Sequence, residues 1–188
     1  FNKESLIGVP GLFKCWKKGN VGIINALGTG VADDKAVYSY VNKMIVYYLG
    51  EQPKLNQVET FLCENKVHRQ HVIENIAKLV VKPANASGGY GIMIGPKAPK
   101  KEREEMIKKI KKNPRDFVAQ PLEILSTIPT ICENGIEPRH LDLRPFILTG
   151  KTSYVTTGGL TRVALRKGST IVNSSQGGGS KDTMVVDA

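Results

Sequence analysis

A lysine followed by a glycine-rich loop is the clearest chemistry-bearing pattern in this sequence. Lys82 ends a short apolar run, Leu79–Val81, which is typical of a strand buried on both faces. Before a second apolar strand at Ile92–Ile94, the chain forms a loop whose small residues are Ser87, Gly88, Gly89 and Gly91. A buried ammonium needs an anionic partner, and glycines let backbone N–H groups approach a ligand closely. The pattern favours a clamp over phosphate, although a β-hairpin whose glycines only make the turn explains it equally well.

Two familiar phosphate-binding motifs do not account for this loop. A Walker loop needs Gly-Lys-Ser/Thr at the start of a helix, whereas Gly177–Lys181 reads GGGSK, in the reverse order. A kinase glycine loop needs a third glycine three residues after the second, and that place, counted from Gly89 and Gly91, is Ile94. A nucleotide would therefore be held by another kind of loop.

Charged side chains alternate with apolar ones on strands predicted at 141–148, 153–165 and 171–175. On neighbouring antiparallel strands, carboxyl and guanidinium groups can converge on one polyphosphate and its Mg²⁺. A plain solvated strand face is the alternative. The residues of interest are Asp142, Arg144, Arg162 and Asn173.

The N-terminal part predicts a strand followed by a helix. Val21–Leu27 is apolar and ends in a Gly-x-Gly turn, and residues 37–48 carry apolar groups at helical spacing. Asp33 or Asp34 can cap this helix, and Gly50 can end it. The arrangement resembles half of a nucleotide-binding βαβ unit, but simple strand-to-helix punctuation is the favoured interpretation.

Two more helices are predicted to support the lysine strand. The helix over Lys66–Lys78 is expected to bury Val67, Ile73, Ile76 and Ala77. His68 and His71 lie one turn apart on it, and without a third partner they favour a solvated face over a metal site.

The second of these helices spans Pro99–Lys112 and has a thin apolar stripe of Met106, Ile107 and Ile110. Eight basic residues lie between Lys97 and Lys112, and three glutamates interrupt them. A solvated face is therefore favoured over a nucleic-acid face. A third short strand is predicted at Phe117–Gln120, and Leu125–Arg139, with its two prolines, is predicted to be irregular.

Composition sets the class of protein. The chain has 188 residues, a net charge of +10 from 27 basic and 17 acidic residues, and an ordinary hydrophobic content of 40%. The charge favours anionic ligands. Three cysteines without metal-site spacing predict reduced thiols in the cytoplasm, and no apolar run approaches the roughly 20 residues that span a bilayer. Both chain ends are expected to be cut from a longer protein.

Several motifs in one order resemble the circularly permuted type 2 ATP-grasp family, whose members are often labelled glutathionylspermidine-synthase-like. The segments that carry the resemblance are KPANASGGYGIMIG, FVAQP, HLDLRPFILTG and GGLTRVALRKGS, and SLIGVPGL and NALGTGV fit ahead of them. The resemblance implies an α+β fold in which two subdomains with mainly antiparallel sheets clasp ATP. The implied domains are a partial Rossmann-like α/β segment over 1–65, a glycine-loop subdomain over 66–125 and a second subdomain over 126–188.

The resemblance also implies roles for individual residues. Lys82 would contact the ATP phosphates under a lid formed by Ser87, Gly88, Gly89, Tyr90 and Gly91. Gln120 and Leu122 would lie at the adenine hinge. On the second sheet Arg144 and Arg162 would stabilise the transition state, while Asp142 and Asn173 would hold Mg²⁺. The implied reaction activates a small-molecule or peptide carboxylate as an acyl phosphate, which an amine then attacks to form an amide.

One departure from the family pattern concerns the metal. Many ATP-grasp enzymes bind metal through Glu-x-Asn, but the residue two places before Asn173 is Ile171. The remaining ligands are expected upstream of Phe1, so this piece alone is expected to be inactive. The alternative function is a non-catalytic nucleotide- or nucleic-acid-binding module, and the acid, the amine and the oligomeric state remain open.

Overall fold

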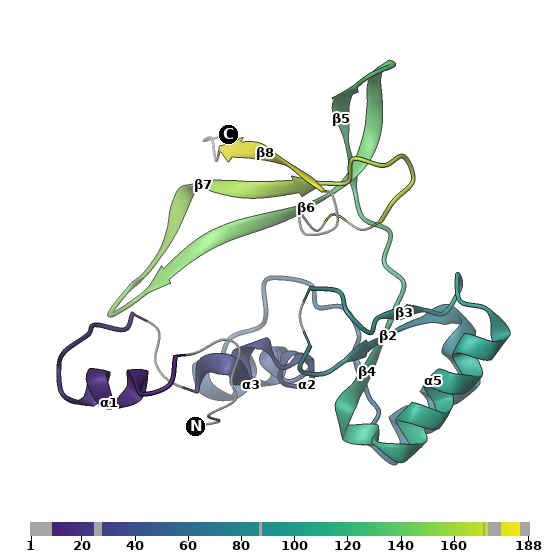
Figure 1. The fold of residues 1–188 in the computed structure, drawn as a ribbon, viewed down its shortest axis with the longest axis horizontal. Helices are drawn as coiled ribbons and strands as arrows, with labels where there is room; N and C mark the ends of the chain where they lie inside the picture. The colour runs from purple at the N-terminus through teal and green to yellow at the C-terminus, as the bar shows by residue number, and fades with distance from the viewer. Residues whose placement is uncertain (1–8, 25–27, 87, 171, 173–177, 185–188) are drawn as a thin grey trace. The chain divides into compact units, whose positions relative to one another are not determined.

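The computed structural model describes residues 9–24, 28–86, 88–170, 172 and 178–184 (Figure 1). The chain divides into two compact units, Phe1–Lys54 and Leu55–Ala188. Mixed helices and two antiparallel sheets agree with the expected α+β class. The finer division into 1–65, 66–125 and 126–188 stays a prediction. No helix in the described ranges is long and apolar enough to cross a bilayer.

The first unit is helical where it is described. Its elements are α1 (Leu12–Lys17), the 3₁₀ helix η1 (Thr29–Asp33), α2 (Lys35–Tyr38) and α3 (Val41–Leu49). Asp34 caps α2 by accepting a hydrogen bond from the Ala36 N–H at 2.8 Å, and Gly50, with φ of 67°, ends α3, as the sequence predicts. The predicted single helix is split because the Ser39 hydroxyl donates to the Ala36 carbonyl at 2.8 Å and competes with the backbone.

The strand expected at Val21–Leu27 is not formed in its described part, residues 21–24. An isolated strand leaves its backbone groups without partners, and the described residues of this unit contain no other strand. Residues 25–27 lie outside the described part.

In the second unit, the first sheet has four antiparallel strands in the order β1-β4-β2-β3. These are β1 (Phe61–Leu62), β2 (Leu79–Pro83), β3 (Met93–Ile94) and β4 (Phe117–Pro121). Strands β2, β3 and β4 confirm the three predicted around Lys82. Because side chains alternate along a strand, Val81 and its partners Ala119 and Met93 share one face.

That face packs against two helices to form the core. The helices are α4 (Lys66–Asn75), which continues as the 3₁₀ turn η2 (Ile76–Lys78), and α5 (Lys100–Lys112), which the 3₁₀ turn η3 (Pro114–Asp116) joins to β4 (Figure 1). The buried cluster consists of Cys63, Val72, Ile76, Leu79, Val81, Met93, Met106, Ile110 and Ala119. Burial raises the pKa of the Cys63 thiol to about 11, which keeps it protonated and inert.

Gly95 closes this sheet against η2. Its N–H donates to the Leu79 carbonyl at 2.9 Å, and a Cβ at this position would lie 1.9 Å from the Ile76 carbonyl oxygen. Only glycine allows the two backbones to approach so closely.

The buried face of α4 differs from the one predicted. Val72 is fully buried, whereas Val67, which was expected in the core, is 77% exposed, and Ala77 is also exposed. Five residues along an α-helix correspond to a rotation of roughly 140° from the starting face, so Val67 and Val72 cannot both face the sheet.

The two α4 histidines contact neighbouring side chains and backbone. The ring Nδ1 of His68 accepts from the Leu62 N–H at 3.2 Å, and the ring of His71 lies 4.6 Å from that of Phe61. No group of three or more His, Cys, Asp or Glu side chains that could hold a metal occurs in the described part of the chain.

The second sheet has the order β5-β6-β7-β8, with all neighbours antiparallel. Its strands are β5 (Thr127–Cys132), β6 (Gly135–Thr149), β7 (Ser153–Val163) and β8 (Gly179–Met184), and Figure 1 shows β6 and β7 as its longest ribbons. The predicted charged strands are confirmed in β6 and β7. The strand predicted at 171–175 lies outside the described residues except for Val172, which is not in a strand.

The prediction that Leu125–Arg139 is irregular is wrong, because β5 and the start of β6 form a hairpin there. Pro129 and Pro138 pair with each other in it. Among the described residues β5 is an edge strand and β6 has no second neighbour before Leu141, so neither proline removes a needed N–H from the described ladder. Gly179 starts β8 opposite Val163.

A cross-strand ion pair links β6 to β7. Asp142 and Arg162 are directly opposite, and the Arg162 Nε donates to Asp142 Oδ1 at 2.8 Å while its Nη2 donates to Oδ2. The hydrogen bonds from this guanidinium, opposed by partial burial, lower the pKa of Asp142 below its ordinary 3.8. The same hydrogen bonds raise the pKa of Arg162. Asp142 is therefore ionised at neutral pH and stays so to a lower pH than an ordinary aspartate.

The core assignment predicts unequal effects of two valine substitutions in α4. Val72→Ala removes two buried methyl groups and should lower the free energy of unfolding by about 2 kcal/mol. Val67→Ala, on the exposed side of the same helix, should change it by less than about 0.5 kcal/mol. Urea unfolding followed by circular dichroism measures both, and equal losses would contradict this packing.

The ion pair predicts a pH-dependent contribution to stability. A lowered folded-state pKa means that the contribution is complete above the unfolded pKa near 3.8 and is lost as the pH falls through the lower folded value. The stability difference between the wild type and Asp142→Asn should therefore shrink in acid. Urea titrations from about pH 7 to about pH 2.5 follow it.

The matched control for this series is Asp182→Asn, which changes an exposed aspartate on β8 of the same sheet. Its stability difference from the wild type should vary less with pH. A difference for Asp142→Asn that stays constant across the range would contradict the ion-pair argument.

Candidate functional site

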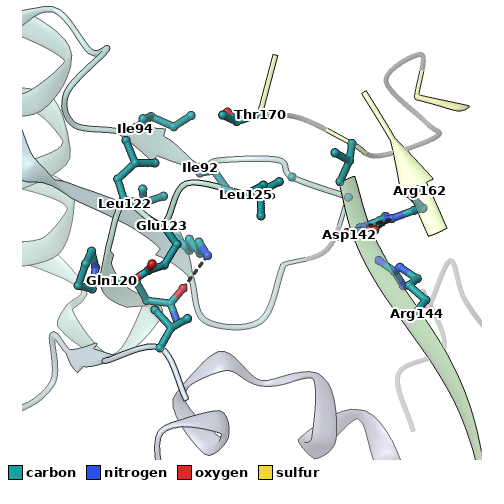
Figure 2. Close-up of a pocket in the computed structure, with 17 residues that line it drawn as sticks. Ile92, Ile94, Gln120, Leu122, Glu123, Leu125, Asp142, Arg144, Arg162 and Thr170 are labelled. Carbon is teal, nitrogen blue, oxygen red and sulfur yellow. Dashed lines mark hydrogen bonds and ion pairs between the residues drawn. The ribbon is translucent and has the colours of Figure 1, made fainter. Parts of the chain in front are cut away.

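A pocket of about 580 Å³ lies within the second unit and is lined by residues of both sheets and of the segment that joins them. Pockets of this size are typical of small-molecule sites. Figure 2 shows Gln120, Leu122 and Glu123 on one side of it and Asp142, Arg144 and Arg162 on the other. The pocket therefore contains groups that are far apart in the sequence.

The first sheet presents its non-core face to the pocket. Val81 and Ala119 point into the core, so the alternating positions on the same strands point the opposite way. These positions include Val80, Lys82 and Gln120, all of which line the pocket together with Ile94 of β3. One sheet thus supplies both the core and the floor of the site.

Lys82 is held by a hydrogen-bonded series of side chains. Its Nζ donates to Gln120 Oε1 at 2.6 Å, an interaction drawn as the dashed line in Figure 2. Gln120 Nε2 in turn donates to Thr60 Oγ1 at 2.8 Å, and that hydroxyl donates to the Val58 carbonyl at 3.0 Å. The ammonium is therefore fixed on the pocket floor.

The glycine-rich loop joins β2 to β3 as the turn of a hairpin, and part of it also lines the pocket. Gly88 and Gly89 are lining residues, with φ of 69° and 81°, values that favour glycine. Tyr90 is 77% exposed, and neither it nor Gly91 is among the lining residues. Ser87 lies outside the described part.

The segment between the two sheets lines the pocket with both apolar and acidic residues. Leu122 and Leu125 supply apolar surface, and Glu123 supplies a carboxylate. The Leu125 carbonyl lies 2.7 Å from Nδ1 of His140 on β6, which ties this segment to the second sheet.

The second sheet contributes the charged wall. Asp142, Arg144 and Arg162 all line the pocket, the first and third as the ion pair described above. Arg144, opposite Leu160, is exposed, and its guanidinium makes no hydrogen bond or ion pair with another described residue. Asn173, the second predicted metal ligand, lies outside the described residues.

The composition of the lining suits a ligand with an anionic and an apolar end. Three cationic side chains, Lys82, Arg144 and Arg162, face two carboxylates, Glu123 and Asp142. Guanidinium groups and glycine N–H groups are the usual partners of phosphate oxygens, and the leucines and isoleucines suit a flat base. The arrangement can bind a nucleotide polyphosphate.

Sequence reasoning named the charged and glycine residues of this lining except Glu123, and it also missed Thr60, which contacts Gln120 behind the lining. Glu123 follows the Gln120–Leu122 segment and could have been included by continuity. Thr60 precedes the two-residue strand β1, and nothing in its local sequence indicates the contact with Gln120, 60 positions away.

Comparison with known proteins identifies related chains. The sequence is 54% identical over 187 residues to the uncharacterized protein sll0335 of Synechocystis, covering 99% of this chain and 39% of that protein. It is 50% identical over 187 residues to the uncharacterized protein Rv2411c of Mycobacterium tuberculosis, covering 99% and 34%. It is also 48% identical over 179 residues to a Frankia casuarinae protein named "Putative glutamate--cysteine ligase 2-2", covering 95% and 21%.

The chain therefore spans about two fifths or less of the length of these relatives. The family model described as circularly permuted ATP-grasp type 2 matches residues 1–164, most of the sequence. This match agrees with the mixed helices and two antiparallel sheets of the fold. The chain belongs to the circularly permuted ATP-grasp type 2 family.

Proposed function

We propose that the pocket binds ATP and that the chain is the nucleotide-binding part of an ATP-dependent ligase joining a carboxylate to an amine. The observation that carries the proposal is the single pocket lined by Lys82 and the glycine loop from one sheet and by Asp142, Arg144 and Arg162 from the other. Family membership supports the use of ATP.

The phosphates would lie against the cationic residues. Lys82 and the backbone N–H groups of Gly88 and Gly89 would contact them from the first sheet, and Tyr90, Gly91 and Ser87 would complete the lid. Arg144 is the guanidinium with no described hydrogen-bond or ion-pair partner, so it can form a bidentate contact with phosphate oxygens without breaking an existing one.

The base would occupy the apolar end. Leu122 and Leu125 of the connecting segment and Ile92 and Ile94 near β3 give this end its apolar surface. Backbone groups next to Gln120 and Leu122 would read the edge of the adenine ring. Burial of a flat base among such side chains contributes binding free energy in proportion to the apolar area removed from water.

The proposed reaction has two steps. A carboxylate oxygen of the acid attacks the γ-phosphorus of ATP, and the bond from this phosphorus to the oxygen that bridges to the β-phosphate breaks. ADP departs and the acid is left as an acyl phosphate. The neutral amine then attacks the acyl carbon, inorganic phosphate leaves with the electrons of the broken C–O bond, and the nitrogen gives up a proton as the amide forms. Arg162, oriented by Asp142, and Arg144 would stabilise the charge that develops on the transferred phosphoryl group.

Mg²⁺ would enter the site with the nucleotide. This ion usually binds one or two protein carboxylates together with substrate phosphates. Glu123 and Asp142 are the acidic residues among the pocket lining, although Asp142 is already engaged by Arg162. Asn173 stays a predicted ligand. When bound, Mg²⁺ would neutralise part of the phosphate charge.

The printed name of the Frankia relative supports an amide-forming reaction class, since a glutamate–cysteine ligase joins a carboxylate to an amine. The chain covers only 21% of that protein, so the name supports no particular acid or amine here. Glutamate and cysteine serve only as the first substrates to test.

The phosphate assignment predicts a loss of ATP binding in Lys82→Met, which removes the ammonium but keeps most of the stem. Loss of a charge-assisted hydrogen bond should weaken ATP binding by about 10- to 100-fold. Isothermal titration of the chain with ATP measures the effect. The control is Lys78→Met, which changes an exposed lysine outside the pocket lining. Unchanged ATP affinity in Lys82→Met would count against the site.

The chemical assignment predicts transfer of an isotope label. The test uses a protein that contains this chain and is as long as these relatives. Given ATP, cysteine and glutamate labelled with ¹⁸O in its carboxylates, it should release phosphate that carries ¹⁸O. Mass spectrometry of the phosphate detects the label. If glutamate does not support ADP release and another acid does, that acid is labelled with ¹⁸O and replaces glutamate. Release of ADP with unlabelled phosphate would contradict an acyl phosphate.

A further inference from the structure

We infer that Gln120 and Thr60 form a positioning relay that sets the position of the Lys82 ammonium in the pocket. The inference rests on the proposed function for the identity of the ligand, ATP. The relay itself consists of contacts between the described side chains of β2, β4 and the segment before β1.

The chemistry of the groups fixes the direction of every hydrogen bond in the relay. An ammonium only donates, so the Gln120 atom 2.6 Å from Lys82 Nζ must be the amide oxygen. The amide nitrogen then faces Thr60 Oγ1 at 2.8 Å and must donate to it. The threonine hydroxyl keeps its own proton for the Val58 carbonyl at 3.0 Å. Only one orientation of the amide satisfies all three contacts.

Strand register places this relay on the pocket side of the sheet. Val80 pairs with Gln120 and Lys82 with Val118, so Lys82 and Gln120 lie diagonally across neighbouring strands on one face. Phe61 pairs with Ala119, so Thr60 falls next to Gln120 on the same face. The opposite face holds the core, and the relay therefore spans the floor of the pocket.

The partner of each cation distinguishes the two walls. Arg162 is held by the carboxylate of Asp142, which offsets its charge, whereas the amide of Gln120 accepts from Lys82 and carries no charge. A neutral acceptor can orient the ammonium without itself adding a negative charge beside it. We expect a carboxylate at position 120 to preserve the position and to weaken the attraction of the ammonium for phosphate.

The first measurement tests the relay without a nucleotide. In the chain labelled with ¹³C and ¹⁵N in its lysines, the Lys82 side-chain signal, assigned by its absence in Lys82→Arg, reports the order of the ammonium. Thr60→Val removes the acceptor for the Gln120 amide at nearly constant volume and should increase the mobility of this signal, and Thr60→Ser should restore it. An unchanged signal in Thr60→Val would overturn the relay.

The second measurement tests its role in the pocket. ATP and AMP are titrated into the same variants, because only ATP reaches Lys82 with all its phosphates. Thr60→Val and Gln120→Glu should lose about tenfold in ATP affinity, with a much smaller loss for AMP. Equal losses for both nucleotides would show a general structural effect and overturn the inference.

The matched control is Thr130→Val. Thr130 makes the same kind of bond, from its hydroxyl to the carbonyl two residues earlier at 3.1 Å, but it lies on β5 outside the pocket lining. It should change neither the lysine signal nor the ratio of ATP to AMP affinity. A wild-type chain that binds neither nucleotide would overturn the ATP assignment, while the lysine signal alone would still decide the relay.

Discussion

The alternation of side chains across the first sheet is the constraint on which the pocket depends. Leu79, Val81 and Ala119 pack beneath the sheet against α4 and α5, and this packing fixes the register of β2 with β4. A slip of one residue would turn Lys82 and Gln120 into the core and leave a buried charge, at a large cost in free energy. The hydrophobic core therefore determines which side chains the ligand meets.

Side chains also alternate across the second sheet, where the face toward the pocket carries an ion pair. The carboxylate of Asp142 orients the guanidinium of Arg162 directly opposite it. Arg144, two residues further along β6, lies on the same face and can contact a ligand. On one wall a carboxylate thus accepts from a cation, and on the other an amide oxygen does so.

Local sequence patterns were enough to predict β2, β4, α5 and the charged strands, because each depends on spacing within a few residues. They did not predict β5, since Pro129 and Pro138 argue against a strand unless both are known to lie where the ladder lacks a neighbour. They also misplaced the buried face of α4. Its one fully buried residue, Val72, is determined by the sheet beneath it and not by the weak amphipathic pattern of the helix. Lys82, Gly88, Arg144 and Arg162 were predicted near the site by resemblance, whereas the contact of Thr60 with Gln120 joins residues too far apart for any local pattern.

The short connection between the sheets couples the two walls. Residues 122–126 connect β4 to β5. They are attached to β6 by the Leu125–His140 contact and by the Leu141 N–H, which donates to the Ser126 carbonyl at 3.1 Å. Leu122, Glu123 and Leu125 of this connection also line the pocket. A ligand that contacts them therefore acts on the same backbone that sets the spacing of the cationic groups. Because one segment performs both roles, binding at the apolar end and binding at the phosphate end cannot be independent, and a base that fits poorly against Leu122 and Leu125 would also displace the second wall from the phosphates.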